Sequence, residues 1–371
     1  MPDRTSPSRR LARVQAAGAS MAVAIRRSVR GVGVVALALL LSQRAGARDD
    51  LIPGFVLQGE GGLVTAFALD PSVASTLYAA TARGLYKTTD SGTSWRRLDS
   101  GLRDLSLLAL AVDPSLPRVL YAATHTGGVF RSADAGEHWT ESNAGMASRH
   151  VGAMAADPRR SGVVYVGGEA GRVYRSDDGA ATWTELSPPT TRVTVTVLAL
   201  DPSGDRIYAG TNGEGIYWTD DGGATWRRPA GALSRGTVWT LTVDAASSEM
   251  FAGTHDGLFH SGDRGATWTA SNRGLRSRSV LAIVRDPATP DTLYAGTAAA
   301  IYRSTDRGRS WSEILSDLYI TALAIDPASP STLYAATHLG VLKSEDAGFH
   351  WKPLRLRAGK EAVLGSGPKG G

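Results

Sequence analysis

Arginines recur at one place in this sequence where their side chains could bind an anion. Each lies eight to ten residues before an aspartate that ends an apolar segment: Arg103, Arg149, Arg192, Arg235, Arg276 and Arg278. A guanidinium group binds carboxylate, sulfate or phosphate through several N–H donors at once. The recurrence therefore predicts a set of anion-binding side chains on one surface. The alternative is that they are solvated loop arginines copied when a repeat was duplicated.

A second set of polar residues follows other apolar segments and would join the same surface. It comprises Arg83, His125, Glu169, Arg172, Asn212, Glu214, His255, Asp256 and His338. Besides the six arginines, we expect His150, Glu214 and His255 to contribute to ligand binding. The histidines have no nucleophile at a recognisable spacing, so nothing supports a serine hydrolase. With no cysteine and no His-x-x-His type of cluster, the sequence predicts neither a metal site nor a cofactor.

Carboxylates on the same loops would support a different chemistry, the hydrolysis of a glycosidic bond. That reaction needs two carboxyl groups about 5 to 10 Å apart. Asp104, Glu214 and Asp317 are the candidate catalytic residues, but the sequence does not give their separations. Trp218 or Trp239 could stack on a sugar, although the position of Trp239 favours a place in the core.

The elements that position these side chains are the units of a repeat. Its clearest part, named here the Asp motif, is Ser/Thr-x-Asp-x-Gly-x-x-Trp. Its seven aspartates are 40 to 44 residues apart: Asp90, Asp134, Asp178, Asp221, Asp263, Asp306 and Asp346. The third copy departs from the pattern, with Ala180 in place of the glycine. Seven copies at this period predict a repeat architecture of seven units.

Each copy of the Asp motif follows three segments in the same order. An apolar strand ends in Asp-Pro, as at Asp70-Pro71, although the fifth copy has Asp244-Ala245. A second strand resembles Tyr78–Thr81, a third runs into the Asp motif, and a fourth starts at its tryptophan. Four short strands in about 40 residues are typical of a β-propeller blade. We therefore predict an all-β fold, a single seven-bladed β-propeller of four-stranded blades with the Asp motif between the third and fourth strands.

The Asp motif itself suits a structural role. A tight turn leaves backbone N–H groups unpaired, and an aspartate carboxylate beneath it can accept them. The glycine supplies a positive φ, and the tryptophan can fill the gap between neighbouring blades. We interpret the seven aspartates as structural and not catalytic, and we expect Ala180 to strain its turn. If these turns and the Asp-Pro turns form one rim, the arginine-bearing loops form the other, around the mouth of the channel.

With these residues in view, the chain from about Val64 to Leu354 resembles the Asp-box, or bacterial neuraminidase repeat, β-propellers. That superfamily includes sialidases, sortilin-type receptors, xyloglucanases and photosystem II assembly factors, so the resemblance implies a fold and no single activity. It also implies that the boxes lie on the rim opposite the ligand-binding mouth. The Arg-Ile-Pro motif of sialidases is absent, and a xyloglucanase would need two propellers where we predict one. The single propeller most resembles assembly-factor-like proteins, which look like binding scaffolds.

The N-terminus predicts export. An apolar run, Gly31–Leu41, follows several arginines and leads to Ala45-Gly46-Ala47, so residues 1–47 are predicted to be a signal peptide, with Met21 as a possible true start. The run is too short to span a membrane. Without this leader the chain has a formal net charge of −2, which gives no argument for nucleic-acid binding. We expect a periplasmic or secreted monomer.

Residues 48–357 are then predicted to form the propeller, and 358–371 a flexible tail. Gly54–Leu57 also resembles a fourth strand and could pair with the last blade, which leaves the mode of closure open. The function predicted is that of an exported, non-enzymatic scaffold that binds a protein, an acidic glycan or a small anion at an arginine-lined mouth. The alternative is a glycoside hydrolase acting on a polysaccharide.

Overall fold

The computed structural model describes residues 62–354, apart from 187–189, 191, 203–205 and 245–246. The predicted signal peptide, the segment Gly54–Leu57 and the predicted tail lie outside these residues. The described residues form β-strands, turns and one short helical turn, η2 (Glu169–Gly171). No helix in this part of the chain is long and apolar enough to cross a membrane.

The strands follow one another in a regular order. The first strands of the units are β1 (Val64–Leu69), β5 (Leu107–Val112), β9 (Val151–Ala156), β13 (Val195–Leu200), β16 (Gly236–Val243), β20 (Val280–Arg285) and β24 (Ile320–Ile325). The second strands are β2 (Leu77–Thr81), β6 (Leu120–Thr124), β10 (Val164–Gly168), β14 (Ile207–Gly213), β17 (Met250–Thr254), β21 (Leu293–Thr297) and β25 (Leu333–Thr337).

The third strands run into the Asp motif. They are β3 (Gly84–Thr88), β7 (Gly128–Ser132), β11 (Val173–Ser176), β15 (Ile216–Thr219), β18 (Leu258–Ser261), β22 (Ala300–Ser304) and β26 (Gly340–Ser344). The fourth strands follow its tryptophan and are β4 (Arg96–Arg97), β8 (Thr140–Glu141), β12 (Thr184–Glu185), β19 (Thr269–Ala270), β23 (Ser312–Ser316) and β27 (Lys352–Leu354).

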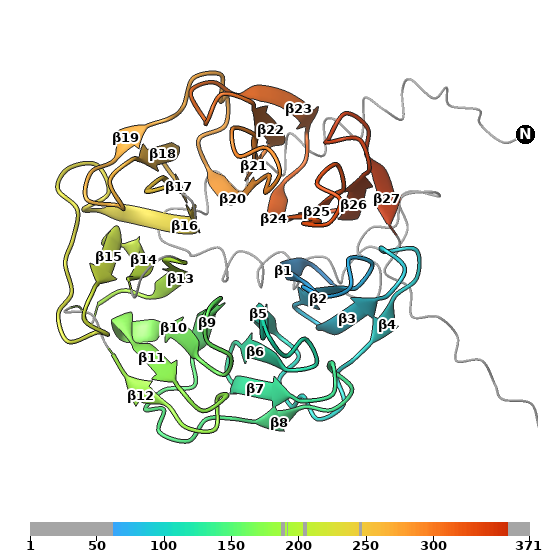
Figure 1. Cartoon of the computed structure of the whole chain (residues 1–371), viewed down its shortest axis with the longest axis vertical. Coiled ribbons are helices and arrows are strands. Elements are labelled where there is room, and N and C mark those ends of the chain that lie inside the picture. Colours follow the sequence, from blue (N-terminus) through green and yellow to red (C-terminus); the bar gives the residue numbers. More distant parts are fainter. Residues whose placement is uncertain (1–61, 187–189, 191, 203–205, 245–246, 355–371) are drawn as a thin grey trace, which may run out of the picture.

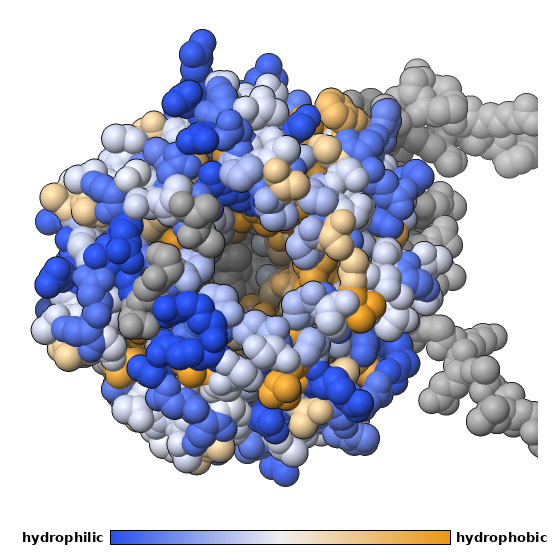
Figure 2. Space-filling model, in the orientation of Figure 1, coloured by the Kyte–Doolittle hydropathy of each residue, from blue (hydrophilic) through white to orange (hydrophobic). Residues whose placement is uncertain are grey.

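These strands form five four-stranded antiparallel sheets and one seven-stranded sheet. The four-stranded sheets are β1–β4, β5–β8, β9–β12, β20–β23 and β24–β27. The seven-stranded sheet joins β13–β15 to β16–β19, because Asn212 and Gly213 pair with Thr237 and Gly236. The sheets follow the chain around a ring (Figure 1), in which each first strand contacts the next and β24 contacts β1. Figure 2 shows that this propeller-like ring is hollow at its centre.

One unit departs from the predicted four strands. After β15 the described residues form no fourth strand, and Trp218 and Arg227 make only an isolated bridge. In other units the residue three positions after the motif tryptophan donates its N–H to the third strand, as Leu98 does. Pro229 occupies this position after β15 and has no N–H to donate. The prediction of a fourth strand was wrong here because of this proline.

The core lies between neighbouring sheets. Every residue of β2, β6 and β25 is buried, and Tyr78 of β2 packs in one cluster with Phe130 of β7. Tyr86 of β3 and Tyr334 of β25 share another cluster, which joins the last sheet to the first. Each sheet therefore hides both of its faces against its neighbours.

The loops gather at opposite ends of the strands. At one end, named here the turn face, the Asp motif turns bond to the loops between first and second strands, as Ser91 N–H does to Ser75 O at 3.0 Å. At the other end, named here the linker face, loops after second strands bond to the linkers into first strands, as His125 N–H does to Ser106 O at 3.0 Å. The arginine-bearing linkers and the Asp motif are thus on opposite faces.

Each Asp motif aspartate accepts hydrogen bonds within its own turn. Asp90 Oδ1 accepts from Thr88 Oγ1 at 2.7 Å and from the N–H of Ser94 at 2.8 Å, and Oδ2 accepts from Ser94 Oγ at 2.6 Å. The bond to the carboxylate from the residue before the tryptophan recurs in every copy. That residue is always Ser, Thr or His, a regularity that the motif as first written leaves out: Ser94, His138, Thr182, Thr225, Thr267, Ser310 and His350.

The exceptional Ala180 takes the glycine conformation, with φ of 70°. Its methyl group is fully buried, and it is accommodated because the preceding sheet presents the small Ser142, whose Oγ donates to Ala180 O. At the second copy this space is filled by a larger side chain. A Cβ at Gly136 would lie 3.0 Å from Leu98 Cδ1. A serine here is not confined to this junction, because Ser271 likewise donates to Gly308 O. It leaves room for the methyl group of Ala180, whereas Leu98 leaves little at Gly136.

Tyrosines of the second strands join neighbouring sheets at the turn face. Their hydroxyl groups donate to a carbonyl of the next Asp motif turn: Tyr78 to Ala135 at 3.4 Å, Tyr208 to Arg264 at 3.0 Å, Tyr294 to Ala347 at 3.1 Å and Tyr334 to Ser91 at 3.4 Å. Burial raises the pKa of Tyr78 to about 12, so its phenol remains a donor. The bond from Tyr334 crosses from the last sheet to the first and helps to close the ring.

Candidate functional site

The arginines predicted to bind an anion fall into two groups on the linker face. Arg103 and Arg149 pair with one carboxylate, their Nη1 atoms lying 3.4 and 3.5 Å from Oε1 and Oε2 of Glu141. Glu141 lies on β8, the outermost strand of its sheet, so these two side chains lie toward the outer edge of the ring and away from its centre.

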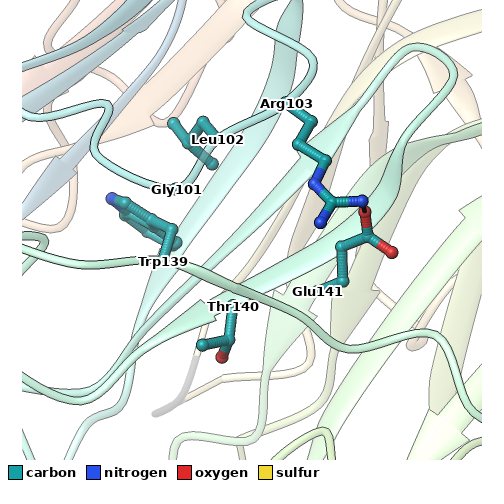
Figure 3. A pocket seen from close by; sticks show the side chains of 6 residues that line it. All are labelled: Gly101, Leu102, Arg103, Trp139, Thr140 and Glu141. Atoms are coloured by element: carbon teal, nitrogen blue, oxygen red, sulfur yellow. Dashed lines mark ion pairs between the residues drawn. The ribbon is translucent and has the colours of Figure 1, made fainter.

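A hollow of about 430 Å³ lies beside Arg103. Figure 3 shows the guanidinium group reaching Glu141 on one side of the hollow, with Leu102 and Trp139 on the other. Leu102 and Trp139 are only 8% and 4% exposed, whereas the Arg103 side chain is 84% exposed. The hollow therefore combines an apolar floor with an exposed cation at its rim.

The second group consists of arginines without a carboxylate partner. Arg192, Arg235, Arg276 and Arg278 are exposed, and none forms an ion pair with any residue that the structure describes. The backbone of Arg276 is fixed, because its N–H lies 3.3 Å from the Tyr302 hydroxyl. Guanidinium groups in this state keep their donors for a ligand.

Glu214 lies near this second group but is already engaged. Tyr217 OH donates to its Oε2 at 2.7 Å. Hydrogen bonds from Tyr217 and Thr190 lower the pKa of the carboxyl, and the charges of Arg228 and Arg192 add to the effect. Glu214 is therefore ionised at neutral pH and does not suit the role of a general acid.

Asp104 joins its own linker to the loop after β6 through hydrogen bonds. Its carboxylate accepts four hydrogen bonds, from the N–H groups of Ser106, Thr126 and Gly127 and from Thr126 Oγ1, at 2.7 to 3.1 Å. Partial burial opposes ionisation, but these bonds outweigh it and hold the pKa below its ordinary value. Like Glu214, this carboxyl is poorly suited to donate a proton.

The three candidate catalytic acids belong to different parts of the ring. Asp104 precedes β5, Glu214 follows β14, and the exposed Asp317 precedes β24. No hydrogen bond or shared partner connects any two of them among the described residues. The structure thus provides no evidence for a carboxylate pair.

The predicted His150 belongs to a small polar cluster. Its Nδ1 lies 3.3 Å from Glu169 Oε1, which also accepts a bond from Ser148 Oγ at 2.8 Å. The ring of His125 stands edge-on to His150, with centroids 6.2 Å apart. Ser148 Oγ bonds to the backbone N–H of His150 and not to its ring, so the cluster is not a nucleophile paired with a base. His255 is exposed, and its N–H lies 3.4 Å from Thr237 O.

The two tryptophans outside the Asp motif differ in burial. Trp218 is 7% exposed, and the guanidinium carbon of Arg206 lies 5.7 Å from its ring centroid. Trp239 is partly buried at an irregularity of β16, and its Nε1 has no hydrogen-bond partner in the described structure. The ring of Trp218 is therefore not an open platform for a sugar.

Three glutamates that pair with linker-face residues escaped the sequence interpretation. Glu141 binds Arg103 and Arg149, Glu185 binds Arg172 at 2.8 Å, and Glu313 accepts from Tyr302 OH at 3.2 Å. A signal was present, because each is two residues after an Asp motif tryptophan, in Trp-Thr-Glu or Trp-Ser-Glu. No group of three or more His, Cys, Asp or Glu residues suited to a metal ion occurs in the described ranges.

Comparisons of sequence found no match among protein-family models or curated proteins. Solved structures do match. The GH74 xyloglucanase from Xanthomonas campestris is 23% identical with a TM-score of 0.67, and the match covers 81% of this chain and 54% of that chain. The GH74 enzyme of Niastella koreensis is 20% identical with a TM-score of 0.70, covering 81% and 55%. This chain therefore spans about half the length of these two proteins.

A third match, the structure of YCF48 bound to D1 peptide, is 14% identical with a TM-score of 0.61 and covers 78% of this chain and 94% of that chain. At identities this low, the structural matches show a common fold and no more than that. The predicted resemblance to the Asp-box, or BNR, β-propeller proteins is confirmed at this level. Since the fold occurs in GH74 enzymes and in a protein that binds a peptide, it assigns neither function.

Proposed function

We propose that this chain, which has the fold of the Asp-box β-propeller proteins, is a non-enzymatic scaffold that binds an acidic protein segment or another anionic ligand. The observation that carries the proposal is the group of exposed, unpaired arginines on the linker face: Arg192, Arg235, Arg276 and Arg278. Leaving several cations without carboxylate partners favours an external anion, the more so because the chain without residues 1–47 is net acidic. The nearby acid Glu214 already accepts from Tyr217 OH, and Asp104, in another part of the ring, accepts from Ser106, Thr126 and Gly127.

The scaffold has further features that belong to the same proposal. The seven-stranded sheet represents two blades joined at the linker face, which makes seven blades in all, and the Asp motif turns are Asp boxes. The signal peptide over residues 1–47 directs export to the periplasm or beyond. These statements are supported by the period of the repeat, the contacts between first strands and the apolar run near the N-terminus.

An extended acidic peptide is the ligand that we favour. YCF48, with the same fold, has been solved with a peptide bound, and a rigid ring with loops gathered at one face can present several arginines without a conformational change. The binding energy would come from arginine–carboxylate contacts and would weaken as salt is added.

The test is charge reversal at the linker face. We expect the triple variant R235E/R276E/R278E to lose at least about tenfold in affinity for a fluorescein-labelled hexaglutamate peptide, a loss of about 1.4 kcal/mol. Fluorescence anisotropy at two salt concentrations measures it. The matched control, R118E/R227E/R309E, changes the net charge equally but lies on the turn face. Equal losses in the two triple variants, or no loss in the first, would contradict the proposal.

The glycoside hydrolase remains the alternative, favoured only by the fold that the GH74 enzymes share with this chain. An assay for hydrolysis of a panel of polysaccharides by the purified protein distinguishes the two functions. Turnover that is abolished by Glu214→Gln or Asp104→Asn would favour the enzyme.

A further inference from the structure

A second hollow, of about 320 Å³, lies on the turn face and is distinct from the proposed binding surface. Its lining comes from two neighbouring units: Arg160, Tyr165 and Arg175 from the β9–β12 sheet, and Asp220, Asp221 and Gly222 from the turn after β15. We name it the turn-face notch. It lies at the type of junction where tyrosines elsewhere bond to the next turn.

Tyr165 in the notch lacks the bond that four of its equivalents make, as does Tyr121 among the described residues. Tyr78, Tyr208, Tyr294 and Tyr334 each donate to a carbonyl of the following turn. Tyr165 is 2% exposed, yet its hydroxyl has no partner among the residues that the structure describes. Burial raises the pKa of this phenol, so the donor keeps its proton. A hydroxyl that lines a hollow without a protein partner is free to donate to an acceptor placed in the hollow.

Arg175 in the notch has one of its faces covered by an aromatic ring. Its guanidinium carbon lies 5.8 Å from the ring centroid of Tyr165. Arg303, at the same position in its own unit, lies 5.9 Å from Tyr294 and also 5.2 Å from Phe349 of the next turn. The arrangement at Arg175 is therefore the same, except that the second ring is missing.

The missing ring has a simple cause. The residue three positions after the motif aspartate faces the cation of the preceding sheet. It is Phe349 against Arg303, and in the second copy it is Glu137, whose charge opposes the burial that lowers the pKa of Lys87. In the fourth copy the residue is Ala224, which is too short to reach Arg175. An aromatic ring at one junction and a carboxylate at another are thus two of the groups that fit this place. The other copies carry Thr93, Ala181, Ala266 and Arg309.

We propose that the turn-face notch binds an aromatic carboxylate. The ring of the ligand stacks on the open face of Arg175, as Phe349 stacks on Arg303. Its carboxylate accepts from the Tyr165 hydroxyl and from Arg175 Nη1, which lies toward Gly222. Nε and Nη2 of Arg175 stay on Asp177, at 2.9 and 2.5 Å, so binding requires no rearrangement of that pair.

The charges around the notch are compatible with this ligand. Asp220 is held by Arg206 through bonds of 2.5 and 3.0 Å, and Asp221 accepts from Thr219 and Thr225 of its own turn. Both carboxylates are thus neutralised or saturated with donors. A volume of about 320 Å³ also lies within the range of small-molecule sites.

The experiment titrates the full chain with benzoate by calorimetry, alongside cyclohexanecarboxylate and benzyl alcohol, which lack the aromatic ring and the charge respectively. We expect benzoate to bind at least about tenfold more tightly than either analogue. Ala224→Phe, which supplies the missing ring from within the chain, should weaken benzoate binding by about tenfold or more. Tyr165→Phe should weaken it by a smaller factor.

The matched control is Ala266→Phe, the same change in the turn of the next unit, and it should leave benzoate binding unchanged. Both alanines are exposed and Phe349 occupies the equivalent position naturally, so both variants should fold, which circular dichroism verifies. Binding that Ala224→Phe leaves intact, or that cyclohexanecarboxylate matches, would overturn the proposal. The triple variant R235E/R276E/R278E should bind benzoate normally, which keeps this test separate from that of the linker face.

Discussion

At the scale of single residues, Asp178 shows how one carboxylate holds a turn. Hydrogen bonds from the side chain and backbone of Thr182, with one from Ser176, lower its pKa to about 2 from an ordinary 3.8. Because the pKa is depressed in the folded state, the stability contributed is complete above the ordinary value and is lost as the pH falls through about 2. We expect Asp178→Asn to lower the midpoint of urea unfolding clearly at pH 6 and much less at pH 2.

Tryptophan fluorescence during urea unfolding at the two pH values measures this difference. Asp317→Asn is the control, since Asp317 is exposed and accepts one bond, from the adjacent Ser316. It should change the midpoint little at either pH. A loss in Asp178→Asn that is as large at pH 2 as at pH 6 would mean that the charge of Asp178 does not stabilise the turn.

The positions of the arginines could be predicted from the sequence, but their partners could not. Spacing placed Arg103 and Arg149 in linkers, and both are there. Their pairing with Glu141 depends on where β8 lies relative to the two linkers that carry them. That position is set by the packing of the sheets and not by local sequence. Separations between Asp104, Glu214 and Asp317 were unpredictable for the same reason, because each comes from a different unit of the ring.

At the scale of elements, the junction between Ser142 and Ala180 predicts coupled substitutions. Ser142→Leu would bring a leucine against the buried methyl of Ala180, which already has a positive φ, and such overpacking costs about 1 to 3 kcal/mol. Adding Ala180→Gly recreates the arrangement of Leu98 and Gly136. We expect the double variant to be more stable than the sum of the two single changes predicts.

A double-mutant cycle from urea unfolding gives the coupling energy, for which we expect about 1 kcal/mol in favour of the double variant. The strand order and the period of the repeat could be predicted because each strand is coded locally, by apolar residues and turn residues. The missing strand after β15 also had a local cause in Pro229. The pairing of β14 with β16 had no such signal, since it depends on two units meeting at the linker face.

At the scale of the whole molecule, the ring is closed by side chains. Tyr334 donates to Ser91 O at 3.4 Å and Thr321 Oγ1 donates to Val64 O at 2.7 Å. We expect Tyr334→Phe to lower the free energy of unfolding by about 1 kcal/mol, the usual contribution of one such bond. Tyr165→Phe is the matched control, because Tyr165 has the same strand position but no partner within the described residues, and it should cost less. Equal losses would show that the closing bond is not what stabilises the ring.

Within the described chain, the last sheet, β24–β27, takes all four strands from residues 320–354, and none is exchanged with the first sheet. The seam where the ring closes is therefore chemically the same kind of boundary as those between consecutive sheets. An in-frame gene segment that codes for one four-stranded sheet could be gained or lost during evolution without changing the strand composition of any other sheet. Only the angle at which neighbours meet would have to adapt, so rings of different size are within reach of a single genetic event.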